Sequence, residues 1–220
     1  MKYIHSVAAA AMLSLMAPVA LQAQTLRMGL EAGWQHSMPS GQNSGNGLYA
    51  GATVAIDFSK EGSGWFADAA MMFDKKQWES SGYLYYPYPG QGIKDVADTW
   101  HYTTYGLKIP VTAGYKWHLS RAVQLYAAAG PYLSLGIAGK ERLVAVGSDG
   151  TVKDDKLSGN VYKDGVMHRA AWGIGGKVGI DVLGHYRLTV SYDHGMSDIF
   201  KKEYIEAKHR TLCVGIGYRF

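Results

Sequence analysis

Histidine is the residue type in this chain best suited to acid–base chemistry, because its pKa lies closest to neutral pH. Five of the eight histidines fall at or near the longer links between patterned segments: His36, His101, His168, His194 and His209. Such side chains could take part in hydrolysis or acyl transfer. The sequence contains neither a G-x-S-x-G motif nor an H-E-x-x-H motif. We therefore predict no catalytic residue.

Metal chemistry is the second possibility. The segment Lys153-Asp154-Asp155-Lys156 holds two adjacent carboxylates between two cations. A calcium loop needs more oxygen ligands, at a regular spacing. We interpret the segment as a solvated loop and expect neither a metal nor a cofactor.

The other charged side chains form a pattern rather than a motif. Several occupy alternate positions between large apolar residues: Glu31, Asp57, Asp68, Lys108, Lys116, Lys177, Asp181 and Arg187. Side chains two residues apart lie on the same face of a β-strand. The charges are therefore expected on one face of their strands, opposite an apolar face.

The elements that would position these charges are eight segments with a two-residue alternation, which indicates strands with two different faces. In one of them, Leu107, Ile109 and Val111 alternate with Lys108 and Pro110. The eight segments are residues 26–34, 48–58, 65–74, 105–117, 123–137, 169–182, 187–193 and 210–220.

The links between the segments alternate in length. Residues 35–47, 75–104, 139–168 and 195–208 form the longer links, and residues 59–64, 119–121 and 183–186 form the shorter ones. Successive connections of an up-and-down barrel lie at opposite ends. The alternation therefore predicts long loops at one end and tight turns at the other, as in outer-membrane barrels.

The two faces distinguish a membrane barrel from a soluble sandwich or a lipocalin-like barrel, which would also show alternating strands. The less apolar face is mostly Gly, Ala and Ser with scattered charges. The other carries aromatic residues near the segment ends, as interfacial girdles do: Trp34, Phe58, Trp65, Phe73, Tyr105, Trp117, Tyr192 and Phe220. We predict an all-β fold, an eight-stranded antiparallel up-and-down transmembrane β-barrel.

Two features place this barrel in the bacterial outer membrane. Residues 1–23 have a positive start, an apolar stretch and a small-residue end at Ala23, which predicts a signal peptide followed by the barrel domain at 24–220. Charged residues are only 18%, below the roughly 25% of soluble domains.

No Lys/Arg cluster marks a nucleic-acid partner, and Cys213 is a single cysteine without an internal disulfide partner.

The segments L-K-I-P-V-T-A-G-Y-K-W (107–117) and L-Y-A-A-A-G-P-Y-L-S-L-G (125–136) resemble the PorT-like outer-membrane β-barrel family of Bacteroidetes. Its members pair an I-P strand with an A-x-G-P-Y-x-S strand. The specific motifs cover about a tenth of the chain. The resemblance implies the fold and the location, and it implies no settled activity.

An eight-stranded barrel is only wide enough for its side chains to fill the interior. We expect the inward-facing charges to form a polar network: Glu31, Asp57, Asp68, Lys108, Lys177 and Asp181. Buried acids and bases should pair, because an unpaired buried charge is costly. An ion pathway is the alternative, which the narrow bore disfavours.

The Tyr/Pro-rich segment 83–89 falls in the longest predicted loop. Tyrosine offers a rigid contact area with a polar tip, which suits binding surfaces. The candidate contact residues for an unknown surface ligand are Tyr83, Tyr85, Tyr86 and Tyr88. The alternative is that these rings rest at the membrane interface or cover the barrel mouth.

The chain ends on a strict alternation, from Leu212 to Phe220. We expect the large residues of this segment to face lipid and the strand to pair with residues 26–34, closing the barrel. Tyr218 and Phe220 resemble the C-terminal signal by which barrel-assembly machinery recognises outer-membrane proteins.

Together these observations predict a small integral outer-membrane protein without enzymatic activity, with a structural role in the envelope or a binding role through its long loops. Its expected partners are outer-membrane lipid, the assembly machinery and a surface ligand. The alternatives are a PorT-like accessory of protein secretion and a lipid-modifying enzyme.

Overall fold

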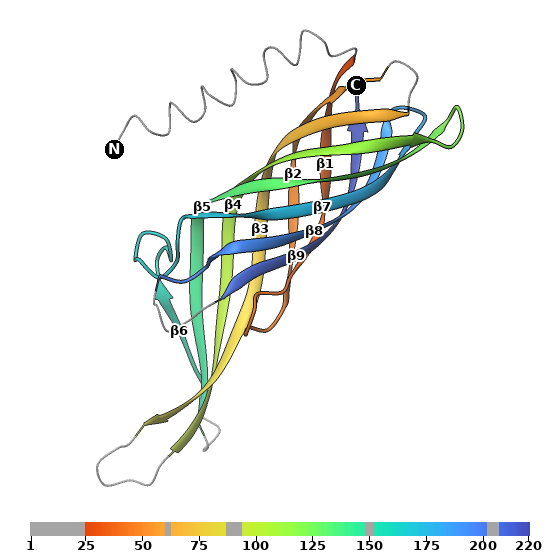
Figure 1. Ribbon diagram of the computed structural model, residues 1–220. Helices are drawn as coiled ribbons and strands as arrows, with labels where there is room; N and C mark the ends of the chain where they lie inside the picture. The colour runs from red at the N-terminus through yellow and green to blue at the C-terminus, as the bar shows by residue number, and fades with distance from the viewer. Residues whose placement is uncertain (1–24, 60–62, 87–93, 148–151, 202–206) are drawn as a thin grey trace, which may run out of the picture.

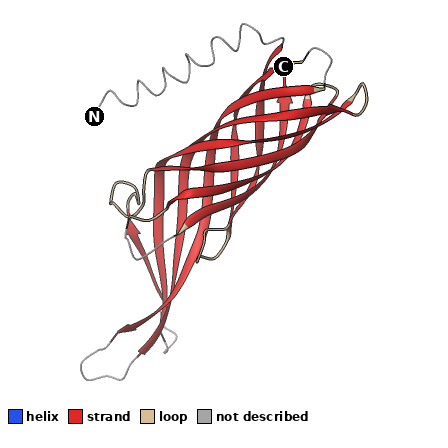
Figure 2. Ribbon diagram, in the orientation of Figure 1, coloured by secondary structure: helices blue, strands red, loops and turns tan. Residues whose placement is uncertain are grey.

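The computed structural model describes residues 25–59, 63–86, 94–147, 152–201 and 207–220. The predicted signal peptide, residues 1–23, lies outside this part. Nine strands make up the described chain (Figure 2): β1 (Thr25–Ser37), β2 (Gly45–Asp57), β3 (Gly64–Tyr86), β4 (Lys94–His118), β5 (Val123–Gly147), β6 (Val152–Ser158), β7 (Ala170–Val182), β8 (Tyr186–Asp198) and β9 (Lys208–Arg219). No helix in these residues has the length and apolarity needed to cross a bilayer.

Eight of the strands form one closed antiparallel ring, which confirms the predicted fold class. The order around the ring is β1-β2-β3-β4-β5-β7-β8-β9, and β9 pairs back to β1. The expected closing pair is present, since Tyr218 lies opposite Leu30 and the Phe220 N–H donates to the Met28 carbonyl over 2.9 Å. The ring leaves no open edge within the barrel wall (Figure 1).

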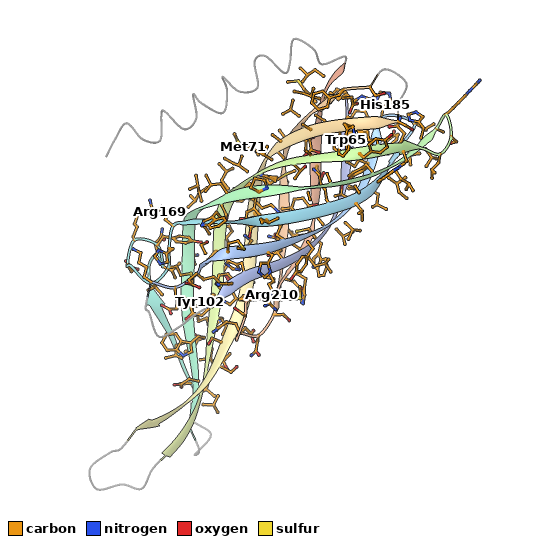
Figure 3. The ribbon with its side chains drawn as sticks, in the orientation of Figure 1. Trp65, Met71, Tyr102, Arg169, His185 and Arg210 are labelled. Atoms are coloured by element: carbon orange, nitrogen blue, oxygen red, sulfur yellow. The ribbon has the colours of Figure 1, made fainter. Side chains whose placement is uncertain are left out.

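The two-residue alternation separates an outer face from an inner one. Leu30, Trp65 and Ile216 are exposed on the outside, whereas Phe66, Tyr126 and Asp181 are at most 2% exposed and fill the inside. Figure 3 shows side chains, among them Met71 and Trp65, projecting outward around the wall. The outer face is therefore the apolar face, as the sequence predicts.

Inward-facing glycines make room for inward-facing tyrosines. A Cβ on Gly215 would collide with the Tyr49 ring, and one on Gly179 would collide with the Tyr126 ring. The bore of an eight-stranded barrel is only wide enough for side chains to fill. The glycines of β7 and β9 therefore let the tyrosine rings lie along the inner wall, over a strand one or two places from their own around the ring.

The predicted long links 75–104 and 139–168 are wrong in large part. Strand β3 continues to Tyr86 and β4 begins at Lys94, with Tyr86 opposite Lys94. Strand β5 continues to Gly147 and pairs with β6, so Lys153–Lys156 is part of a strand rather than a solvated loop. Figure 1 shows these extensions reaching well beyond the ring. We call residues 80–86, 94–101, 140–147 and 152–158 the projecting sheet.

A β-bulge lies where the ring passes into the projecting sheet. Tyr105 pairs with Ala138 and Gly106 pairs with Gly136, so Ile137 is the extra residue in β5. Ile137 is exposed on the outer face, and beyond it Gly139 and Glu141 point inward. A bulge bends its strand and sharpens the local twist. It therefore re-aims β5 at the mouth of the barrel.

Candidate functional site

The end of the bore near Phe220, here called the terminal end, is filled by two groups of ion pairs. Asp57 pairs with Lys116 and with Arg27, the latter over 3.2 Å from Nε to Oδ2. Asp181, which is 1% exposed, accepts hydrogen bonds from Arg187 Nε over 2.7 Å and from Arg219 Nη1 over 2.8 Å. Arg187 also lies over the Tyr126 ring, 4.0 Å from its centroid.

The middle of the bore is filled by a second set of contacts. Lys177 Nζ lies 2.7 Å from Asp68 Oδ2, and Lys108 Nζ lies 2.6 Å from Asp193 Oδ2. Glu31 accepts a hydrogen bond from the Tyr49 hydroxyl over 2.9 Å. The six charged residues selected from the sequence thus all face the bore, and each has a polar partner there.

Several partners in the bore were not selected from the sequence. Arg27, Asp193 and Arg219 lie on the alternating inner face, at the ends of predicted segments. Asp74 ends the third segment and Lys76 lies beyond it, with Lys76 Nζ 2.8 Å from Asp74 Oδ2. The inward parity within the predicted segments already includes the other four residues, and extending it by two residues adds Lys76.

Two small cavities lie in the bore of the described residues. One of about 50 Å³ lies mid-bore between Asp68, Lys108 and Glu31, and one of about 30 Å³ lies near the mouth beside Asp74 and His209. A cavity needs about 10–15 Å³ of such space to hold one water. Each of these two cavities therefore has room for one or a few waters.

The mouth at the opposite end, here called the loop end, is covered by a hydrophobic cap. Val161 and Met167, from the segment between β6 and β7, are 0% and 1% exposed. They pack with Phe200, Trp78 and Tyr102 in one cluster. Trp78 stacks on Tyr102 with ring centroids 5.6 Å apart, and it forms a T-shaped pair with His209, with ring centroids 5.0 Å apart.

Glycines at the mouth accommodate the cap. A Cβ on Gly136 would collide with the Tyr162 ring, and one on Gly139 would come within 2.5 Å of the Val161 side chain. The main chain reinforces this contact, since the Val161 N–H donates to the Gly139 carbonyl over 3.1 Å. The cap is therefore seated on the bulged part of β5.

The histidines at the loop end have separate surroundings. His36 Nδ1 lies 2.8 Å from Asn46 Oδ1, and His101 Nδ1 lies 2.9 Å from Glu79 Oε1. His209 lies at the mouth, beyond the lipid-facing residues of β9 that begin at Leu212. Burial and the charge of Lys76 lower the pKa of His209 to about 3. No group of three His, Cys, Asp or Glu side chains in the described residues could hold a metal ion.

Three of the four candidate contact tyrosines lie in a strand rather than in a loop. The backbone of Tyr83, Tyr85 and Tyr86 belongs to strand β3, opposite Ala97, Asp95 and Lys94, and Tyr88 lies outside the described residues. At the terminal end, Tyr218 stacks on His185 and contacts Phe220 edge-on.

A direct test of the filled bore is its electrical conductance. We expect the purified protein, inserted into planar bilayers in 1 M salt, to give no stable channel, because ion pairs and the cap block the path of hydrated ions. Co-flotation with liposomes checks that the protein has inserted. Long-lived, uniform current steps in most insertions would contradict a sealed bore.

A closed ring with an apolar outer wall and a bore filled by charged side chains defines an integral β-barrel of the outer membrane. A family model described as "Outer membrane protein beta-barrel domain" matches residues 22–201. The chain belongs to this family, and its location is the outer membrane.

Solved structures with a similar fold share little sequence with this chain. OprG of Pseudomonas aeruginosa shares 12% identity over 88% of this chain and 95% of that one, with a TM-score of 0.42. Neisserial surface protein A shares 13% over 89% and 97%, with a TM-score of 0.41, and Ail of Yersinia pestis shares 15% over 89% and 97%, with a TM-score of 0.37. Among curated proteins, none matches the sequence.

Proposed function

We propose that this protein is a non-enzymatic, non-conducting barrel that displays the projecting sheet outside the cell as a binding surface. The observation that carries the proposal is the open edge of β3. The last β2 residue paired to β3 is Leu48, opposite Lys75, and the last backbone pairing on that side is the bridge between Asn43 and Glu79. Beyond this bridge the Asn43 side chain donates to Ser81 Oγ over 2.9 Å. Within the part of the chain that the structure describes, the backbone of residues 80–86 of β3 pairs with β4 on one side and with no strand on the other.

The sequence of this edge favours pairing with another strand. Residues 80–86 read S-S-G-Y-L-Y-Y and carry no charge, whereas the other outer strand of the sheet, β6, carries four charges at 153–156. Charged side chains protect a sheet edge from pairing with other chains, and an uncharged edge remains available. An extended segment of a partner protein could add to β3 as a further strand.

The bridge to Asn43 indicates which amides point outward. The Glu79 N–H donates to the Asn43 carbonyl over 3.3 Å, away from β4. Because N–H groups alternate along a strand, those of Ser81, Tyr83 and Tyr85 point to the same open side. Proline at one of these positions removes a docking donor without removing a bond to β4.

The test compares Tyr83→Pro with Tyr83→Thr, since both lose the ring and only the proline variant loses the N–H. Peptides enriched from a random displayed library on the protein in nanodiscs serve as the probe. We expect at least a tenfold weaker Kd for Tyr83→Pro than for Tyr83→Thr, because a ladder hydrogen bond is lost and the proline ring obstructs the edge. Equal affinities, or no enriched peptide, would exclude strand addition at β3.

The PorT-like resemblance supports a second candidate, an accessory role in protein secretion. Its two motifs lie side by side, with Pro110 of β4 opposite Tyr132 of β5. Under this candidate, a strain lacking the protein retains secreted cargo, whereas a surface-binding role leaves secretion intact.

A further inference from the structure

The lipid-facing wall contains a shallow, open groove of about 640 Å³ that crosses β4, β5, β7 and β8. Its lining is mainly apolar and includes Trp65, Tyr115, Val178, Val190 and Tyr192. The groove lies outside the bore, since most of these side chains belong to the exposed outer face. It is distinct from the projecting sheet and from the cap.

The floor of the groove consists of small residues in hydrogen-bonding register. Ala113 of β4 lies opposite Ala129 of β5, Ala129 lies opposite Gly176 of β7, and Gly176 lies opposite Tyr192 of β8. The next outward-facing residue of β5 toward the terminal end is Ala127, which is also small. On β7, larger side chains stand on either side of the floor, Ile174 and Val178.

Packing of the barrel does not require a glycine at position 176, unlike the other glycines of β7. Gly173, Gly175 and Gly179 of the same strand could not carry a Cβ, because it would collide with atoms of β8 or with tyrosine rings in the bore. A Cβ on Gly176 would meet only the Ala128 carbonyl oxygen, at 3.9 Å. The space above Gly176 is therefore kept open toward the membrane.

The loop end of the groove carries positive charge. The groove ends at Tyr192 and Leu212, and two residues further along these strands His194 lies opposite Arg210. Two residues span about 7 Å of strand. Arg210 is exposed and makes no ion pair with any residue of the described chain, and Lys208 is exposed beyond it. Trp65 lies toward the terminal end and Arg210 toward the loop end (Figure 3).

We propose that this groove holds an acyl chain of a phosphate-bearing lipid, with the phosphate bound by Arg210 and Lys208. Inside a bilayer the groove has to be filled by apolar atoms, because empty space forfeits dispersion contacts. An anionic headgroup complements the free guanidinium, which can bind phosphate through two parallel hydrogen bonds. A second copy fits less well, since a twofold axis along the membrane normal would place two Arg210 side chains at the same edge of the interface.

The test is native mass spectrometry of the detergent-purified protein with added dipalmitoyl phosphatidylglycerol. We expect discrete one-lipid adducts, reduced at least fivefold by Gly176→Trp, which fills the groove. The matched control is Ala52→Trp, at an exposed outer position of β2, which should leave the adducts unchanged. Arg210→Gln combined with Lys208→Gln should reduce binding of this lipid and leave binding of dipalmitoylglycerol unchanged. A heat-shifted gel band confirms that each variant has folded.

Three results would overturn the proposal. The first is equal adduct levels for the wild type and Gly176→Trp. The second is equal loss for Gly176→Trp and Ala52→Trp, which would indicate non-specific lipid contact. The third is a dimer that Gly176→Trp converts to a monomer, which would assign the groove to a second copy. Peptide binding at β3 is measured separately, so its failure and failure of lipid binding remain distinguishable.

Discussion

Replacing Asp181 with Asn is expected to lower the free energy of unfolding by about 3–5 kcal/mol, the cost of removing one partner from a buried ion pair. Asp181 is the acceptor shared by Arg187 and Arg219, and all three side chains are buried. The variant leaves two guanidinium groups in the bore with a neutral amide between them. Urea titration in lipid vesicles, followed by the heat-shifted gel band, measures the loss.

The matched control for this variant is Asp154→Asn. Asp154 also binds an arginine, Arg142, but the two side chains are 45% and 55% exposed. Exposed pairs contribute about 0–1 kcal/mol, because water solvates both partners when they separate. A similar loss in the two variants would show that burial of the Asp181 cluster is not the source of its contribution.

Trp78→Ala is expected to open the cap. The indole is 1% exposed and stacks on Tyr102, and truncating a buried tryptophan costs about 3–5 kcal/mol, with a cavity left behind. We expect that cost to be felt at the mouth, because the ring in the membrane does not depend on Trp78. The measurement is trypsin cleavage of the protein in liposomes at Lys163 and Arg169, two exposed sites in the segment that covers the mouth.

Trp172→Ala provides the comparison for the cap variant. Trp172 is 54% exposed on the outer wall, so its truncation removes lipid contacts and leaves the mouth intact. Cleavage at Lys163 and Arg169 should rise at least tenfold in Trp78→Ala and stay near the wild-type rate in Trp172→Ala. Unchanged cleavage in both variants would mean that the cap stays closed without Trp78.

The ring could be predicted from the sequence because one physical constraint governs its whole length. Lipid demands large apolar side chains outside, and the narrow bore accepts small or charged ones inside, so every ring strand repeats the same alternation. Strand β9 is the clearest example: Val214 and Ile216 are exposed while Cys213 and Arg219 are buried. The closing pair with β1 follows from the same rule.

The projecting sheet could not be found by the same rule, because its faces exchange character beyond the membrane. On β3 the outward residues change from Phe73 to Lys75 and Gln77, while the inward residue Trp78 becomes large and apolar. A search for a continuous apolar outer face ends where this exchange begins. The two-residue period itself continues past this point, so the period predicts the full length of the strand better than the apolar face does.

The cap depended on contacts that no local pattern encodes. Val161 and Met167 sit in a segment with neither alternation nor helical spacing, and they are buried only because Gly136 and Gly139 leave room for the segment. The partners of the bore charges are equally distant in sequence. Lys177 and Asp68 are 109 residues apart, so the pairing follows from the closed ring.

The ion pairs across the bore also constrain the order in which the barrel can be built. Lys108 of β4 pairs with Asp193 of β8, and Asp68 of β3 pairs with Lys177 of β7 and lies 3.8 Å from Arg187 of β8. A sheet that had entered the bilayer before β7 and β8 joined it would expose these charges to hydrocarbon, where each costs several kcal/mol. The charges of Lys108 and Asp68 are neutralised only when β7 and β8 join the sheet. We therefore expect insertion to be cooperative: the strands should close around these charges before the wall meets lipid, because an incomplete sheet would expose them to hydrocarbon.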